Sequence, residues 1–352
     1  MRKINRASRI GFISALTLLF RCDGFTARVS PWSSLKRGNT LSLFRQATAD
    51  NTVVEWNVYV DQSKASLEKR ANTALDAFLA LAPSSVEVTP AVFKSKAKGG
   101  MIRCISSKKN KTFEVSNVDS VDKVYRILTK HMELKVSTKV CDCLKWKYKG
   151  NGHLEAGQID LAIDAYDKAI ETGVTQQEGI VLLMRSTAYL QRAITHRTTL
   201  KEIVNELIGM VPSALPFVFD EAIRHPSLAN AIFRKFVEQT ERQDKHFRKT
   251  QYRHGLYQYA LLKAAQDAIR ATQLLPYYEV AWLRAGEILS ELWRLKESAQ
   301  YYEKAIDLDS SLEPSLRPVI ERLRLRQELL DTARAYGWTE DILRLALDYQ
   351  RA

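Results

Sequence analysis

Two kinds of hydrophobic spacing divide the chain. Between residues 53 and 134, short apolar runs alternate with polar connections, and the first run, Val53–Val60, is rich in β-branched and aromatic residues. Such a run is typical of a strand. The next stretch, Ser66–Ala82, has apolar residues on one helical face. From Lys145 onward the apolar spacing is helical almost throughout. The pattern therefore predicts a small α/β domain over residues 50–138, followed by a helical region.

The α/β region has the predicted order strand, helix, three strands, helix. Pro83 and Pro90 bracket a short apolar strand, and this favours a sheet edge because proline cannot donate a ladder hydrogen bond. Residues 101–106 and 112–117 are two further strand patterns joined by a polar connection. Asp119 is expected to cap the last helix, Val121–Met132. No family resemblance is apparent in this region.

A repeated residue pattern runs through the helical region. Trp146 and Gly150 have the same spacing as Trp282 and Gly286, and the small and aromatic residues after them also correspond. Another unit, between these two along the chain, is split, because its second helix follows its first only after an insert. The residues expected to pack helix against helix are Trp146, Gly150, Gly157, Ala162, Tyr166, Ala169, Tyr189, Ala264, Ala271, Pro276, Trp282, Gly286, Tyr302 and Ala305.

This pattern resembles the tetratricopeptide repeat (TPR), a helical hairpin of about 34 residues. The resemblance implies a mainly α fold, a TPR helical-hairpin solenoid over residues 139–316 with a long insert in the second repeat and a small α/β domain before it. The expected repeats cover about 143–176, 179–192 plus 257–278, and 279–312, with the insert at about 193–256. The end of the insert is expected to continue into the helix that follows. Residues 317–352 are expected to form C-terminal capping helices, because the end of a solenoid otherwise exposes its stacking face.

Some positions of the predicted concave face match a peptide-binding site. Chaperone-binding members of this family hold the terminal carboxylate of a peptide with a clamp of lysine, asparagine and arginine side chains. Lys147, Asn151 and Arg284 match that clamp, whereas Met184 and Val280 replace one asparagine and one lysine. The resemblance therefore implies at most a partial clamp for a chaperone C-terminal tail, as in a co-chaperone of the Hsp70/Hsp90 type.

The other groove positions are apolar. They are Ile180, Leu183, Met184, Val280 and Leu283. This composition favours an extended or helical segment of another protein as the occupant of the groove. Alternatively, the insert or the α/β domain of this chain fills the groove, because exposed apolar patches are usually covered.

Basic charge is concentrated in two segments of the chain, whose formal net charge is +13. Residues 1–49 carry nine basic residues and one acid, and residues 94–149 carry fifteen basic residues and five acids. Lysines gather in the loops of the α/β region, and basic residues alternate with aromatic ones in the insert. Such clusters can bind RNA or an anionic membrane surface. A solvated helix face explains the insert better, because Glu238, Glu241 and Asp244 dilute its charge.

The N-terminal segment, residues 1–49, has the composition of a presequence. Four basic residues precede the apolar run Ile10–Phe20, which is typical of a signal peptide. Phe25–Ala49 then lacks acids and is rich in Ser and Thr, like a transit peptide. The combination resembles the bipartite plastid presequence of algae with secondary plastids. We expect plastid localisation, with the secretory pathway or another organelle as the alternative.

The sequence contains no pattern that indicates catalysis. No Gly-rich phosphate loop, G-x-S-x-G or H-E-x-x-H motif occurs. Cys141 and Cys143 lack two further ligands at metal-site spacing. We therefore expect no catalytic residue, metal or cofactor. The predicted function is a non-enzymatic protein–protein interaction scaffold or assembly factor of the plastid. The alternatives are a co-chaperone with a partial clamp and a plastid RNA-associated factor that uses the basic loops.

Overall fold

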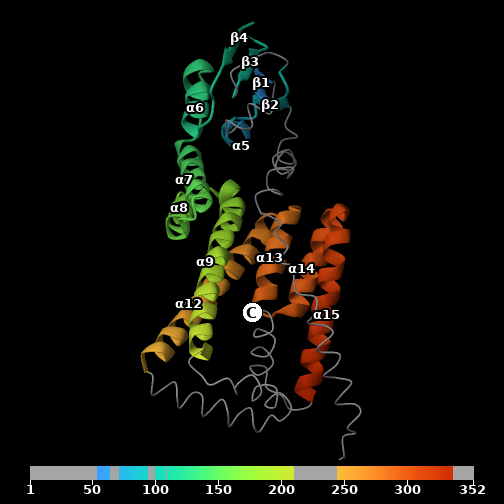
Figure 1. Cartoon of the computed structure of the whole chain (residues 1–352). Coiled ribbons are helices and arrows are strands. Elements are labelled where there is room, and N and C mark those ends of the chain that lie inside the picture. The colour runs from blue at the N-terminus through green and yellow to red at the C-terminus, as the bar shows by residue number, and fades with distance from the viewer. Residues whose placement is uncertain (1–53, 64–70, 94–99, 109, 210–243, 336–352) are drawn as a thin grey trace, which may run out of the picture. The chain divides into compact units, whose positions relative to one another are not determined.

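The computed structural model describes residues 54–63, 71–93, 100–108, 110–209 and 244–335 (Figure 1). The predicted presequence and residues 210–243 of the insert lie outside this set. The chain divides into two compact units. Among the described residues, one unit contains 54–194 and 258–313, which include the α/β region. The other contains 195–209, 244–257 and 314–335.

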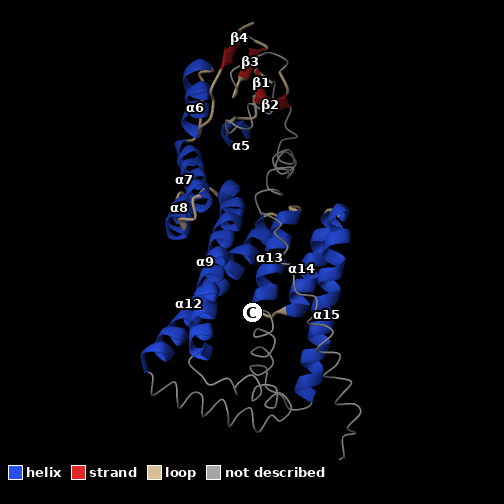
Figure 2. Cartoon of the chain, in the orientation of Figure 1, coloured by secondary structure: helices blue, strands red, loops and turns tan. Residues whose placement is uncertain are grey.

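A four-stranded sheet forms the centre of the α/β region, with strand order β2–β1–β3–β4 (Figure 2). Strand β1 pairs parallel to β2 and antiparallel to β3, and β3 pairs antiparallel to β4. The predicted element order is confirmed, and β2, which contains Pro90, lies at an edge of the sheet. The elements are β1 (Trp56–Asp61), α5 (Ala71–Leu81), β2 (Val86–Ala91), β3 (Ile102–Ser106), β4 (Thr112–Val115), α6 (Val121–Arg126) and a π-helical turn, η1 (Ile127–His131).

The core of the α/β region extends into the helical region. Every second residue of β1 is buried, as expected for a strand with one face against a core. Helix α5 adds Ala74, Ala77 and Phe78 to this cluster. The same cluster includes Cys141 and Leu144, which belong to α7 (Thr138–Glu155). The first helix of the helical region therefore shares one hydrophobic core with the sheet.

The predicted cap of α6 is wrong by one residue. Ser120 is the N-cap of this helix, with an extended backbone and no capping hydrogen bond from its side chain. The Asp119 carboxylate instead forms an ion pair with Lys123, at 2.9 Å. A carboxylate four residues before a lysine reaches it along the helix surface, and this pairing competes with capping.

The described chain is mainly helical after residue 137, and consecutive helices pack against each other as hairpins (Figure 2). The prediction that the end of the insert continues into the following helix is confirmed from residue 244 onward, because α12 (Asp244–Leu274) is one helix of 31 residues. The earlier part of the predicted stretch lies outside the described residues. Helix α9 is also continuous and runs beyond residue 193, where the first helix of the split unit was expected to end. The helices are α7, α8 (Ile159–Glu171), α9 (Thr175–Gly209), α12 (Asp244–Leu274), α13 (Glu279–Glu291), α14 (Leu295–Leu308), the 3₁₀ turn η2 (Ser310–Leu312) and α15 (Glu313–Ala335).

We number the hairpins along the chain: α7–α8 is the first, α9 with α12 is the split one, and α13–α14 is the third. The turns inside the first and third hairpins share a left-handed residue. Gly157, between α7 and α8, has φ of +73°, and Trp293, at the corresponding place between α13 and α14, has φ of +62°. Glycine adopts this left-handed conformation without a steric cost, whereas a bulky side chain does not. The third hairpin therefore makes its turn with a residue that is unfavourable there.

Candidate functional site

Close contact between a glycine and a tyrosine defines two of the hairpins. A Cβ atom placed on Gly150 of α7 would lie 2.6 Å from Cε1 of Tyr166 on α8, and one on Gly286 of α13 would lie 2.9 Å from Cδ1 of Tyr302 on α14. Both tyrosines are buried. The glycines thus let each pair of helices approach until the ring of the second helix fills the gap.

Hydrogen bonds complete each of these contacts in a different way. In the first hairpin the Tyr166 hydroxyl donates to Oδ1 of Asn151, at 2.8 Å. In the third hairpin the Ser298 hydroxyl donates to the carbonyl of Gly286, at 2.7 Å. Asn151, a predicted clamp residue, is therefore used in helix–helix packing in this structure.

The other residues expected to pack between helices differ in how far their side chains are buried. Ala162, Ala169, Ala264, Ala271 and Ala305 are buried, and Trp146, Tyr189 and Trp282 are partly exposed. The Trp282 indole lies 5.3 Å from the ring of Tyr301 and donates from Nε1 to the carbonyl of Pro276. Gly157 is exposed and has no atom within 4 Å of a built Cβ, so backbone conformation is the structural reason for glycine there.

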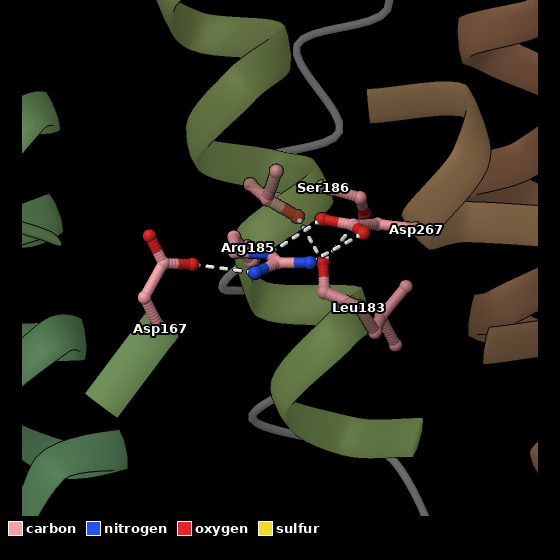
Figure 3. A network of polar contacts seen from close by, with 6 residues as sticks. Asp167, Leu183, Arg185, Ser186 and Asp267 are labelled. Carbon is pink, nitrogen blue, oxygen red and sulfur yellow. Dashed lines mark hydrogen bonds and ion pairs between the residues drawn. The ribbon is translucent and has the colours of Figure 1, made fainter. Parts of the chain in front are cut away.

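An arginine joins three helices around the split hairpin, and sequence analysis did not identify it (Figure 3). Arg185 of α9 donates to both carboxylate oxygens of Asp267 on α12, from Nε at 2.7 Å and from Nη2 at 2.8 Å. Its Nη1 donates to Asp167 on α8. Burial acts to lower the pKa of Arg185, but the hydrogen bonds and charges of the two aspartates outweigh burial and raise it.

This network links segments that lie on either side of the insert. Arg185 and Asp267 are 82 residues apart in sequence, yet their side chains form a bidentate pair. At the start of α9, a Cβ on Gly179 would lie 2.7 Å from Cγ of Leu275, which is a second close contact between the two halves. The sequence does contain one signal for this network: Arg185 is a single basic residue inside an otherwise apolar run of α9.

Lys147, the first predicted clamp residue, is enclosed by the chain itself. It is 3% exposed, and its ammonium lies 2.7 Å from the carboxylate of Asp76 on α5. It also donates to Oε1 of Gln177 at 3.3 Å. The Tyr148 hydroxyl donates to the same Asp76 carboxylate, and burial followed by the charge of Asp76 raises the pKa of Tyr148.

The remaining groove candidates differ in accessibility. Leu183, Met184, Val280 and Arg284 are at most 7% exposed, and the Arg284 guanidinium pairs with Glu287 on its own helix. Ile180 and Leu283 are partly exposed. Within the described part of the chain, these two are the predicted apolar groove residues that offer surface to another molecule.

The lysines of the predicted basic loops are described only in part. Lys94, Lys96, Lys98 and Lys109 lie outside the described residues, as do the insert residues between 210 and 243. Lys108 forms an ion pair with Glu55.

Cysteines and other metal-binding residue types do not form a site in the described part of the chain. Cys104, Cys141 and Cys143 are buried free thiols, and burial raises the pKa of each. Among the described residues, no three His, Cys, Asp or Glu side chains are grouped as they would be around a metal ion. No helix in the described ranges has both the length and the hydropathy needed to cross a membrane.

Comparison with known proteins identifies one of the hairpins. The model of the tetratricopeptide repeat family matches residues 280–312, which cover α13 and α14. A similar solved structure is the Arabidopsis OM64 TPR domain, at 16% identity and a TM-score of 0.31, and the match covers 53% of this chain and 96% of that chain. No curated protein matches the chain. The third hairpin is thus similar in sequence to a tetratricopeptide repeat.

Proposed function

We propose that this protein is a non-enzymatic scaffold that holds a segment of another protein through its TPR-like hairpins. The observation that carries the proposal is the third hairpin, which matches the repeat family and contains the same glycine–tyrosine contact as the first. Stacked hairpins of this kind present extended surfaces to partner proteins. The buried cysteines and the paired arginines of the described hairpins are explained by packing, without a reaction.

The partner would contact the groove at its accessible apolar positions. Ile180 on α9 and Leu283 on α13 are partly exposed, unlike the buried residues beside them. An apolar side chain on a first helix of a hairpin suits an extended or helical segment that places its own apolar residues in the groove. We therefore assign partner binding to Ile180 and Leu283, with Leu183, Met184 and Val280 as the packed layer beneath.

Charge substitution tests this assignment. Ile180→Glu and Leu283→Glu, each in the full chain, should abolish recovery of the partner in crosslinking mass spectrometry of an organellar extract, because a carboxylate cannot enter an apolar contact without desolvation. Leu161→Glu is the matched control, since Leu161 is 50% exposed on the second helix of the first hairpin. If the folded Leu283→Glu variant still recovers the same partner, the groove proposal is wrong.

We further propose that the scaffold acts in a plastid, as an assembly factor for an organellar complex. The support is the composition of residues 1–49, in which a basic and apolar segment precedes an acid-free, Ser/Thr-rich one. A fluorescent protein fused behind residues 1–49 should accumulate in the plastid of an alga with secondary plastids. Retention in the secretory pathway, or accumulation in another organelle, would disprove this localisation.

The chaperone-tail and RNA alternatives lack a supporting observation. A terminal carboxylate could use Lys147 only after the buried Lys147–Asp76 pair separates, and the two other clamp positions are Met184 and Val280. In the α/β region, Lys108 is paired with Glu55. Both alternatives therefore rank below the apolar groove.

A further inference from the structure

Two lysines converge on one indole ring in the first hairpin. The Lys149 ammonium on α7 lies 4.8 Å from the centroid of the Trp146 ring, and the Lys168 ammonium on α8 lies 4.7 Å from it. Both lysines are exposed, and Trp146 is partly exposed. Neither lysine forms an ion pair with any other described residue. Two like charges therefore lie over one indole ring, and neither is paired with a described carboxylate.

The third hairpin shows the same indole in a different environment. Its Trp282 packs against the ring of Tyr301, at 5.3 Å. The position that corresponds to Tyr301 in the first hairpin is Ala165, and the position that corresponds to Lys149 in the third hairpin is Ala285. The first hairpin thus has an alanine where the third has an aromatic neighbour, and a lysine where the third has an alanine. Packing alone does not require that difference, since the third hairpin packs its indole against the ring of Tyr301.

We infer that Trp146, Lys149 and Lys168 form a docking site for one carboxylate of a partner protein, next to an apolar group that packs on the indole. Two ammonium groups can donate charge-assisted hydrogen bonds to a single carboxylate, and an indole offers an apolar surface beside them. The inference rests on the proposed scaffold function and adds a second contact to the groove.

The acidic residues around Lys168 favour a single carboxylate over a polyanion as the ligand of this site. Exposed acids flank the site on α8, namely Asp160, Asp164 and Glu171. They would repel a polyanion such as RNA or an anionic membrane, whose charges extend over the whole helix surface. A single side-chain or terminal carboxylate needs only the two ammonium groups, neither of which is paired with those acids. The charge pattern therefore points to an acidic position in a protein segment.

The test is a titration of the full chain that reports on Trp146 directly. The indole N–H signals are recorded in a ¹⁵N-labelled sample, and the Trp146 signal is assigned with Trp146→Phe. The probe is acetyl-Leu-Glu-Leu-amide, and acetyl-Leu-Gln-Leu-amide is the uncharged control. We expect the Glu peptide to shift the Trp146 signal with weak, saturable affinity and the Gln peptide to leave it in place. Lys149→Gln and Lys168→Gln should each weaken binding about three- to fivefold, the upper range for an exposed pair.

A matched lysine in the third hairpin provides the control for general charge effects. Lys304 is the counterpart of Lys168, and its ammonium lies 3.9 Å from Asp307. Lys304→Gln should leave the titration unchanged. The site is wrong if the Trp146 signal does not respond, if both peptides shift it equally, or if the response survives in Lys149→Gln/Lys168→Gln. An oligouridylate that shifts the signal more strongly, with steep salt dependence, would reassign the site to nucleic acid.

The outcome is separable from the test of the groove. Leu283→Glu changes α13 and should leave the peptide response at Trp146 intact. If Leu283→Glu still recovers the partner while the Glu peptide shifts the Trp146 signal, the groove assignment is wrong and the carboxylate site stands. If Leu283→Glu abolishes recovery while the Trp146 signal does not respond to the peptide, only the carboxylate site is wrong.

Discussion

Gly150 and Tyr166 touch so closely that no larger residue fits at position 150. A Cβ atom there would lie 2.6 Å from Cε1 and 2.8 Å from Cδ1 of the tyrosine ring. The ring is fully buried and its hydroxyl is held by Asn151, so it has no free space into which to move. The separation of α7 and α8 therefore depends on the absence of one methyl group.

Gly150→Ala should destabilise the protein by about 1–3 kcal/mol, the usual cost of overpacking a core. Gly152→Ala on the same helix is the control, because nothing lies within 4 Å of its built Cβ. That control should stabilise the protein by about 0.5–1 kcal/mol, since alanine loses less backbone entropy in a helix. Urea unfolding followed by circular dichroism measures both. Equal effects of the two substitutions would contradict the steric explanation.

Asp76→Asn should cost about 3–5 kcal/mol, because it leaves the Lys147 ammonium buried without its anion. The two charged groups lie 2.7 Å apart, and the lysine side chain is 4% exposed. Lys147→Met combined with Asp76→Asn should be much closer to wild type, since no unpaired charge then remains buried. A double-mutant cycle by urea unfolding gives the coupling energy. Additive effects of the two single changes would show that the pair does not connect α5 to α7 energetically.

Arg185→Gln should destabilise the split hairpin, because the Asp267 side chain is only 9% exposed and would lose its cation. We expect a loss of about 3 kcal/mol and faster hydrogen exchange in α12. Arg192→Gln is the matched control on the same helix. Its pair with Asp160 is longer, at 3.4 Å, and exposed, so its loss should cost about 0–1 kcal/mol. Equal effects on α12 exchange would argue against the network in Figure 3.

The free energy of unfolding should decrease as the pH rises toward 9 and above. Burial raises the pKa of the Cys104 thiol from 9.0 to about 12. Between these values the unfolded thiol loses its proton while the folded thiol keeps it, so the unfolded state binds fewer protons and gains stability relative to the folded state. The slope is up to about 1.4 kcal/mol per pH unit for each such group.

Cys104→Ala should make this decrease shallower, whatever it does to stability at neutral pH. Val58→Ala provides the control, because Val58 is the β1 residue opposite Cys104 in the sheet and does not titrate. Urea unfolding from pH 8 to pH 9 covers a window in which the tyrosines, with an ordinary pKa of about 10, are still mostly protonated in both states. An unchanged slope in Cys104→Ala would mean that the thiol is not responsible.

Much of the fold could be predicted because its signals are local. Helical and strand spacing indicated the order of the elements, and Gly150, Tyr166, Gly286 and Tyr302 marked two hairpins by their spacing alone. The small residues are informative because a helical hairpin has few ways to pack two helices this closely.

The partners of the charged residues could not be predicted from the local sequence pattern. The burial of Lys147 depends on Asp76, which is 71 residues away, and the pairing of Arg185 depends on an aspartate beyond the insert. A lysine has the same local pattern whether it faces a peptide or a carboxylate of its own chain. The end of α9 was also missed, because its helical spacing continues past the last residue that the repeat requires.

The distance in sequence between Arg185 and Asp267 has a consequence for how the chain folds. The first hairpin closes with Asn151 and Tyr166, 15 residues apart, whereas the split hairpin must bring together residues 82 apart. Chain closure over the longer span costs about 1.5 kcal/mol more in entropy. We therefore expect the first and third hairpins to gain amide protection early during refolding and the split hairpin to gain it last. Pulse-labelled hydrogen exchange would show this order, and simultaneous protection of all three would mean that the insert imposes no delay.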